Sequence, residues 1–598
     1  MSEAQVHVSP ATDTLSLTGS EVVLRALVEQ DVEIVFGYPG GAVLPIYDAM
    51  FQQNRLKHVL VRHEQGAVHA AEGYARSSGK VGVVLVTSGP GATNTVTGLT
   101  DALMDSVPIV CLTGQVPTHM IGNDAFQEAD TVGITRPCTK HNYLVKDPAD
   151  LARVVHEAFH VARSGRPGPV VIDLPKDILM GQAPYLPRED AAHRSYYPVT
   201  DPKLDAIERA VDLIARAERP LFYVGGGVIN AGPEACENLR TLVRETGHPI
   251  TLTLMALGAF PANDDQFLGM LGMHGTLEAN MAMYDCDLMI NIGARFDDRV
   301  TGRLDGFSPD STKIHVDIDP SSINKNVTVD LPIIGDAGRA LEAMLACWRR
   351  KGYRRNDERT RGWWRQIDGW RARQSLRFKA SKTVIKPQHA IQRLYELTKD
   401  RETYITTEVG QHQMWAAQHY KFDEPFRWMT SGGLGTMGYG FPSAMGVQLA
   451  HPDALVIDVA GEASWVMNMQ EMSTLMQYRL PVKTFILNNS YMGMVRQWQD
   501  FFHGNRHSES YMDSLPDFVK LAEAFGAVGL RATKPDELDA VIEEKIAVDK
   551  PVIADIVVDR AENVYPMIPG GKAHNEIMLS PDDAAEPVVG SEDGMVLV

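Results

Sequence analysis

Short hydrophobic runs alternate with longer amphipathic stretches along most of the chain. Each run is rich in Val, Ile and Leu and has the length of a buried strand, and a glycine turn and a helical pattern usually follow it. Such alternation is typical of parallel sheets with helices packed on them. The sequence therefore predicts an α/β protein with three doubly wound parallel-sheet domains. The clearest runs lie at residues 58–61, 81–87, 108–112, 221–224, 288–292, 313–318, 454–459 and 482–487.

Length and polar interruptions indicate how these elements divide. A chain of 598 residues is longer than a single hydrophobic core normally supports. Polar segments at 191–202 and 382–387 separate the three α/β regions. The first and third regions share size and alternation, which predicts similar sheets on either side of a middle domain. We expect a flexible N-terminus at 1–17, domains at 18–185, 200–350 and 388–560, a linker helix at 351–387 and a tail at 561–598.

Charge and cysteine usage narrow the class of protein. The formal charge of -19 argues against a nucleic-acid partner or an anionic membrane surface, and no apolar stretch is long enough to span a bilayer. The five cysteines include no CxxC pair, so neither a disulfide framework nor a zinc site is indicated, and a reducing, cytoplasmic location is expected. The basic cluster at 349–355, close to several tryptophans, is interpreted as an amphipathic linker helix with a solvated basic face.

Polar residues follow two strands of the third region. Gly461, Glu462, Ala463 and Ser464 come directly after one strand, and the next strand ends at Asn489, 27 residues beyond Glu462. The carboxyl ends of parallel strands meet at one sheet edge, where a carboxylate and an amide oxygen can hold Mg²⁺ beside a phosphate. A helix predicted to start near Asn468 would point its N-terminus at that phosphate. The alternative is an ordinary helix-entry turn.

The first region offers a carboxylate in a comparable place. Glu64 lies in the first helical turn after the strand at 58–61, where an acidic residue is more often a partner of the helix dipole than a catalyst. Glycine-rich loops at 37–41 and 88–94 could line the same cleft. The segment 433–438 fits the GxGxxG pattern, but no convincing strand precedes it, so a nicotinamide site is a poor interpretation.

The segment from Gly461 to Asn489 resembles the thiamine-diphosphate signature, which begins Gly-Asp-Gly and ends Asn-Asn. Here Glu462 replaces the aspartate, and its extra methylene would displace the ion, change the binding rotamer or lower the affinity. The resemblance implies that Glu64 hydrogen-bonds the aminopyrimidine ring and that Met437 is an apolar wedge under the cofactor, with a buried core methionine as the alternative. The implied metal ligands are Glu462, Asn489 and Tyr491, and the implied cofactor contacts are Gly435, Met437, Gly461, Ala463 and Ser464.

Longer strings resemble acetolactate synthase large subunits over roughly 18–578. The resemblance implies that Trp498, with Met494, favours 2-ketobutyrate as the second substrate and that Arg299 pairs with its carboxylate, roles that an indole and a guanidinium can perform. The alternatives are a core tryptophan and a surface ion pair. Gln127 and Lys176 would orient substrate, and Gly41 and Phe126 would come from a partner subunit. The strings are 63–73, 87–94, 114–117, 126–128, 164–169, 174–177, 410–415 and 491–499.

The middle region resembles the flavin-binding region of the same family. In that family FAD is bound without a net redox role, so the identity of the nucleotide rests on the resemblance and not on spacing. Arg166 of the first region would reach the same site. The residues implied are Gly225, Gly226, Gly272, His274, Gly293, Arg295, Asp317 and Asp336.

The function implied is decarboxylation of pyruvate on thiamine diphosphate and transfer of the two-carbon unit to pyruvate or 2-ketobutyrate, the first common step of branched-chain amino-acid synthesis. In this family the cofactor bridges two subunits, which implies a homodimer or homotetramer. The resemblance also implies a separate small subunit that regulates the activity of the catalytic chain. Glyoxylate carboligase and pyruvate oxidase rank lower: the former has an apolar residue where Glu64 stands, and the latter lacks the Met494/Trp498 pattern. A non-catalytic paralogue is favoured only by Glu462.

Overall fold

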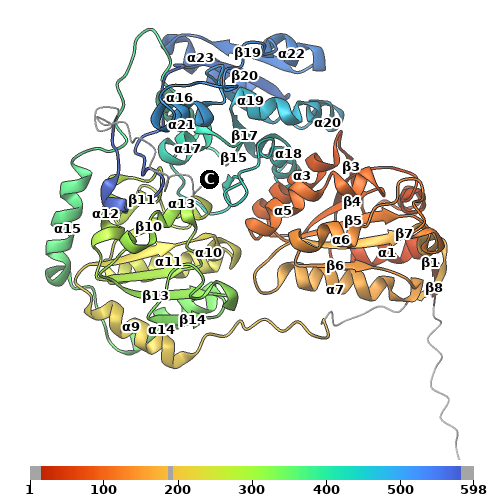
Figure 1. The fold of residues 1–598 in the computed structure, drawn as a ribbon, viewed down its shortest axis with the longest axis horizontal. Coiled ribbons are helices and arrows are strands. Elements are labelled where there is room, and N and C mark those ends of the chain that lie inside the picture. The colour runs from red at the N-terminus through yellow and green to blue at the C-terminus, as the bar shows by residue number, and fades with distance from the viewer. Residues whose placement is uncertain (1–14, 186–192, 581–598) are drawn as a thin grey trace, which may run out of the picture.

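The structure is a computed structural model, and it describes residues 15–185 and 193–580. Three six-stranded sheets follow one another along the chain, and the neighbouring strands in each are parallel. In Figure 1 the first domain (red to orange) and the middle domain (yellow to green) lie on opposite sides, and the third domain (cyan to blue) lies across both. The predicted class, α/β with three parallel-sheet domains, is confirmed.

The first domain has the strand order β3-β2-β4-β5-β7-β6. Alternate residues of its strands enter two separate cores: Val83 and Leu85 pack on one side, and Val84 and Val86 on the other. Because side chains alternate across a strand, both faces of this sheet are covered. The strands are β1 Leu15–Thr18, β2 Ile34–Tyr38, β3 Lys57–Leu60, β4 Gly82–Val86, β5 Ile109–Gln115, β6 His141–Leu144, β7 Val170–Pro175 and β8 Gln182–Tyr185. The helices are α1 Gly19–Glu29, α2 Leu44–Phe51, α3 Glu64–Ser78, α4 Pro90–Thr93, α5 Val96–Met104, α6 Thr131–Thr135, α7 Leu151–Arg163 and α8 Lys176–Met180.

The middle domain has the order β11-β10-β9-β12-β13-β14, the order of dinucleotide-binding sheets. Its first strand, β9, therefore lies at the centre of the sheet, where the direction of winding reverses. The strands are β9 Pro220–Val224, β10 Ile250–Leu252, β11 Phe267–Met270, β12 Leu288–Ile292, β13 Thr312–Asp317 and β14 Leu331–Ile334. The helices are α9 Leu204–Arg216, α10 Gly226–Asn230, α11 Pro233–Thr246, α12 Leu277–Asp285, α13 Asp298–Thr301 and α14 Ala337–Arg350, and α15 Asp357–Arg371 follows the domain.

The third domain, with the order β16-β15-β17-β18-β20-β19, repeats the topology of the first. Val456 and Ile486 belong to a core shared with the first domain, and Ile457 and Phe485 to one shared with the middle domain. The third sheet therefore holds the other two domains on its two faces. Its strands are β15 Thr403–Thr407, β16 Trp428–Met429, β17 Leu455–Ala460, β18 Lys483–Asn488, β19 Val528–Ala532 and β20 Val552–Val557. Its helices are α16 Pro387–Thr398, α17 Gln411–His419, α18 Gly440–Ala450, α19 Glu462–Trp465, α20 Met472–Tyr478, α21 Gly493–Phe502, α22 Phe518–Phe525 and α23 Leu538–Ala547.

The chain ends are more regular than the sequence predicted. Within the expected flexible N-terminus, β1 pairs antiparallel with β8, while residues 1–14 lie outside the described part of the chain. In the expected tail, Val564, Met567 and His574 are fully buried, and residues 581–598 lie outside the described part. Part of the expected linker, 186–192, also lies outside it. Long-range pairing and burial, which local composition does not reveal, order both segments.

Two helix predictions were wrong. The helix expected near Asn468 begins at Glu462 instead, and Asn468 sits at a kink, where its side chain donates to Gly438 O at 2.5 Å. The linker helix expected over 351–387 is confined to α15, because α14 ends at Arg350 and a turn separates the two.

The basic cluster has acidic partners. Arg349, Arg350 and Lys351 pair with acidic residues of α9 and α11, at 2.5–2.7 Å. Trp348 and Trp363 are buried in the hydrophobic cores. The tryptophans are thus packed, and the cluster attaches the end of α14 to the middle domain.

No helix within residues 15–185 and 193–580 combines the length and the apolar character needed to cross a bilayer.

Candidate active site

The carboxyl edge of the third sheet carries the predicted metal-binding residues. Glu462 is the first residue of α19 and is separated from the end of β17 only by Gly461, and Asn489 directly follows the neighbouring strand β18. The Tyr491 N–H donates to Glu462 Oε1 at 2.9 Å and to Asn489 Oδ1 at 3.0 Å. The three predicted metal ligands therefore belong to one hydrogen-bonded group.

Glu462 is suited to hold a cation. Its side chain is 1% exposed, and burial raises its pKa to about 7. The other groups that act on this carboxyl are backbone N–H groups and Asp555, none of them cationic. A divalent cation would offset the cost of burying the carboxylate, and the donor set of carboxylate and amide oxygens is the one that Mg²⁺ prefers. The residues present therefore fit Mg²⁺, with glutamate in place of aspartate.

A buried histidine lies beside this group. A Cβ added at Gly461 would stand 2.6 Å from His412 Nδ1, so only glycine fits between them. His412 Nε2 is buried and has no hydrogen-bond partner among the described residues, and burial lowers the pKa of the ring to about 3. A neutral imidazole with a free nitrogen can donate to a phosphate oxygen. From the sequence, His412 was noted only as part of the segment 410–415 that resembles acetolactate synthases, and no role was predicted for it.

Glu408 organises the loop that carries the predicted wedge, and sequence reasoning missed it. Its fully buried carboxyl accepts from Ser464 Oγ at 2.6 Å, Gly438 N at 2.7 Å and Phe441 N at 2.9 Å. Ser464 is thereby tied to the loop of Met437, which is partly exposed and is not a core methionine. The signal was available, because Glu408 directly follows β15 at the same sheet edge as Glu462.

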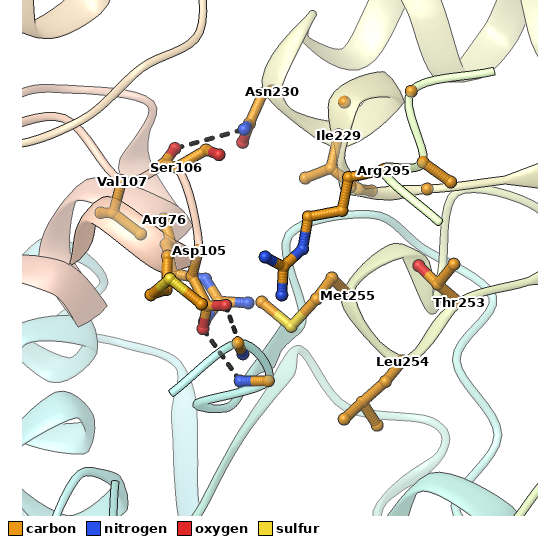
Figure 2. A pocket seen from close by; sticks show the side chains of 18 of the residues that line it. Arg76, Asp105, Ser106, Val107, Ile229, Asn230, Thr253, Leu254, Met255 and Arg295 are labelled. Carbon is orange, nitrogen blue, oxygen red and sulfur yellow. Dashed lines mark hydrogen bonds between the residues drawn. The ribbon is translucent and has the colours of Figure 1, made fainter. Parts of the chain in front are cut away.

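A cavity of about 1110 Å³ lies between the three domains. In Figure 2 Arg295 reaches from the middle domain toward Asp105 of the first domain, while Asp105 accepts from the backbone N–H groups of Gly432 and Gly433 in the third domain. Gly272 does not line the cavity, but a Cβ added at this position would stand 2.8 Å from Arg299 O. The other residues predicted for the nucleotide line the cavity itself: Arg166, Gly225, Gly226, His274, Gly293, Arg295, Asp317 and Asp336.

The residues predicted to select substrate line the same cavity. Arg299, Met494 and Trp498 come from two domains and meet there, together with Gly435 of the third domain. Trp498 packs on Phe502 with ring centroids 4.9 Å apart and is only partly buried, so it is not a core residue. Arg299 lies 3.7 Å from Asp298, but both side chains are more than half exposed, which leaves the guanidinium available to a carboxylate.

The predicted residues of the first domain form a separate group. Glu64 begins α3, and its carboxylate accepts from Asn94 Nδ2 at 2.9 Å. Phe126 is 88% exposed, and Gln127 follows it with a φ of +59°. Gly41 has open space around it, and Lys176 begins α8. The Glu64 carboxylate is bonded to Asn94, whereas Glu462 and Asn489 are bonded to Tyr491 N, so the two predicted halves of the site form separate hydrogen-bonded groups.

Glu471 attaches the third domain to the loop before Glu64. Its buried carboxyl accepts from the backbone N–H groups of Arg62 at 2.9 Å and His63 at 3.0 Å and from Thr474 Oγ1 at 2.7 Å. This residue, too, was not identified from the sequence, because the two backbone N–H groups that it holds lie about 400 positions away in the chain.

Glu471 makes stability depend on pH. Burial raises its pKa to about 7, above its usual value of 4.5, so its stabilising contribution is complete at low pH and is lost as the pH rises from about 4.5 to 7. Glu471→Gln cannot ionise, and its free energy of unfolding relative to the wild type should rise by roughly 2 kcal/mol between pH 5 and pH 8. Urea unfolding at both pH values measures this, with the exposed Glu358→Gln as control. A difference independent of pH would contradict the prediction.

Comparison with known proteins adds the family. Three models match in order: the N-terminal TPP binding domain of thiamine pyrophosphate enzymes at 17–134, the central domain at 207–344 and the C-terminal TPP binding domain at 408–556. The chain is 52% identical over 569 residues to the acetolactate synthase isozyme 3 large subunit of Escherichia coli, covering 94% of this chain and 99% of that one.

The chain belongs to the family of acetolactate synthase large subunits. It is also 50% identical to the acetolactate synthase large subunit of Haemophilus influenzae, over 94% of this chain and 98% of that one. The acetolactate synthase of Mycobacterium leprae is 48% identical, over 94% and 91%. The resemblance stated from the sequence is confirmed, and this family is favoured over glyoxylate carboligases and pyruvate oxidases.

Proposed function

We propose that this chain is the catalytic subunit of an acetolactate synthase, which decarboxylates pyruvate and transfers the two-carbon unit to pyruvate or 2-ketobutyrate. The observation that carries the proposal is the convergence of Arg299, Met494 and Trp498 on one cavity that also contains Gly435 of the cofactor loop. A reaction between two keto acids requires a cation that binds a carboxylate, apolar side chains that contact the alkyl group, and a loop that contacts the cofactor.

Some of the predicted site residues would bind the cofactor, and others would orient the substrate. Glu462, Asn489 and the backbone carbonyl of Tyr491 would hold Mg²⁺, and His412 would donate to the diphosphate. Glu64 would move a proton at the aminopyrimidine ring. Bound thiamine diphosphate supplies the electron sink for decarboxylation. Gln127 and Lys176 would orient the donor keto acid.

Trp498 would set the preference for the second substrate. Its ring lines the cavity beside Arg299, so an acceptor held through its carboxylate would direct its alkyl group toward the indole. Trp498→Leu should lower the preference for 2-ketobutyrate over pyruvate by about tenfold or more, since one methylene in an apolar pocket changes selectivity by that order. Competition between the two keto acids, with both products quantified, measures this.

Phe502→Leu, which changes the neighbour of Trp498 but not the tryptophan, serves as the matched control. An unchanged product ratio in Trp498→Leu would remove Trp498 from this role.

The large cavity supports FAD as a bound nucleotide. Its volume of about 1110 Å³ is at the upper end of ligand sites, and Arg166 and Arg295, two of the arginines that line it, would face a diphosphate. The glycines after β9 and β12 leave room for a backbone approach. FAD would be held by the middle domain and would take no net redox part.

The two halves of the site would meet only between two chains, in a homodimer or homotetramer. Glu64 and Glu462 belong to separate hydrogen-bonded groups, and Phe126, which is predicted to come from a partner subunit, exposes 88% of its surface beside the predicted catalytic residue Gln127. The family resemblance, in which the cofactor bridges two subunits, carries this proposal. We also propose, from the family, a separate regulatory small subunit and a cytoplasmic location.

Mixing two inactive variants tests the shared site. If each site takes Glu64 from one chain and Glu462 from the other, a hybrid of Glu64→Gln and Glu462→Gln chains contains one fully wild-type site and one doubly altered site. Mixed chains refolded or coexpressed together should therefore regain activity, up to about half per hybrid dimer. Each variant mixed with itself is the control. If isolated hybrid dimers have no activity, Glu64 and Glu462 of the same chain must act in the same site, and the shared site is wrong.

The function itself is tested by acetolactate formation from pyruvate with thiamine diphosphate and a Mg²⁺ titration, for the wild type and Glu462→Asp. Product from the wild type supports the proposal. Product only from Glu462→Asp would identify a catalytically impaired chain, and product from neither would refute the proposed reaction.

A further inference from the structure

A buried group of ligating side chains lies outside the sites described above, where the first domain meets the third. His69 and Glu72 are on α3 and Asp101 is on α5, and all three are fully buried. One nitrogen or oxygen from each lies within 4.8 Å of the others, and His69 Nδ1 is 3.0 Å from Glu72 Oε1. This arrangement joins one imidazole and two carboxylates in a dry interior.

The protein around this group does not satisfy it. Glu72 Oε2, Asp101 Oδ2 and His69 Nε2 are buried and have no hydrogen-bond partner among the described residues. No lysine or arginine of the described chain forms an ion pair with either carboxylate. The positive charge of the nearby Arg76 acts on the Glu72 carboxylate, but its hydrogen bonds go to Thr430 O at 2.5 Å and to Tyr439 Oη at 3.1 Å. Two buried carboxylates with unpaired oxygens are costly unless a cation or protons compensate them.

We propose that His69, Glu72 and Asp101 bind a divalent transition-metal cation, Zn²⁺ or Mn²⁺. An imidazole nitrogen favours the first-row metals over Mg²⁺, and carboxylates are ligands common to Zn²⁺ and Mn²⁺. Ligand atoms bound at about 2.0–2.2 Å from one tetrahedral ion stand roughly 3.3–3.6 Å apart. Binding therefore draws together ligand atoms that now lie within 4.8 Å of one another. The metal is held within one chain, apart from the magnesium site at Glu462.

The cation would fasten the loop that carries the predicted cofactor contacts. Asp101 Oδ1 accepts from Ser431 Oγ at 3.1 Å, and Ser431 Oγ accepts from Thr436 N at 2.8 Å, between Gly435 and Met437. Asp105, which caps the C-terminal end of α5, accepts from Gly432 N and Gly433 N. A metal fixing Asp101 would thereby fix the 430–439 loop. None of the three ligands lines the cavity between the domains, so the ion would have a structural role and no direct part in the reaction.

The test measures metal content and position directly. The full-length wild type, saturated with Mg²⁺ and thiamine diphosphate, is exposed to Zn²⁺ or Mn²⁺, passed through gel filtration and analysed by mass spectrometry of the metals. One ion per chain is expected in the wild type, with affinity at least about 10–100-fold weaker in Glu72→Gln and Asp101→Asn. Glu462→Gln and the exposed Glu358→Gln should retain the ion.

Crystals of the wild type soaked in Zn²⁺ or Mn²⁺ need no variant. Anomalous scattering should place a peak between His69, Glu72 and Asp101, and 1,10-phenanthroline should lower the unfolding temperature of the wild type while Mg²⁺ is in excess. A wild type that retains no Zn²⁺ or Mn²⁺, or a peak elsewhere, would overturn the proposal and indicate protons shared between the two carboxyls. Neither readout depends on acetolactate formation, so this inference and the proposed function fail independently.

Discussion

Glu64→Gln is expected to reduce acetolactate formation by about 10²–10⁴-fold, the usual loss when a positioned acid or base is removed. The substitution keeps the length of the side chain and an oxygen that can accept from Asn94 Nδ2, so the start of α3 should remain intact. What it removes is the ability to hold and transfer a proton at the cofactor ring. Initial rates with saturating thiamine diphosphate and Mg²⁺ measure the loss.

Asn94→Ser is the companion variant for this prediction. It removes the partner of the Glu64 carboxylate and leaves the carboxylate itself, so it should cost far less activity than Glu64→Gln. Equilibrium binding of thiamine diphosphate should change little in either variant. A Glu64→Gln enzyme with more than a tenth of wild-type activity would show that another group moves the proton.

Glu462→Gln should weaken the apparent binding of Mg²⁺ by at least about 100-fold, and thiamine diphosphate should dissociate with the metal. The physical reason is that a neutral amide replaces a buried carboxylate that has backbone N–H partners and would have the cation as its compensating charge. The hydrogen bond from Tyr491 N can persist to the amide oxygen, so the loop after β18 should keep its conformation. Calorimetric titration of Mg²⁺ in the presence of thiamine diphosphate measures the change.

Glu462→Asp separates charge from length. If this glutamate is a metal ligand, the aspartate variant should bind Mg²⁺ at least as tightly as the wild type, because charge is retained and the shorter side chain matches the signature of thiamine-diphosphate enzymes. Unchanged Mg²⁺ binding in Glu462→Gln would mean that the metal is held without this residue.

The local sequence pattern was sufficient to predict the central strands and the sheet edge with the predicted metal ligands. Continuous Val, Ile and Leu runs marked the central strands, because strands buried on both faces need apolar side chains throughout. A carboxylate one glycine beyond β17 and an amide after β18 indicated the edge of the sheet where a metal could bind, because the carboxyl ends of parallel strands lie at one edge. Both inferences require only neighbouring residues and the geometry of one sheet.

Tertiary structure alone decided where the domains meet. The pairing of β1 with β8, the kink at Asn468 and the partners of Glu408 and Glu471 join residues that are distant in sequence. The position of Glu408 after β15 could be read from the sequence, but the partners of these residues could not. The gathering of Arg299, Trp498 and Gly435 around one cavity follows from the third sheet packing the other two domains on opposite faces. The sequence by itself determined which residues could do the chemistry, and the packing of the three domains decided which of them lie together.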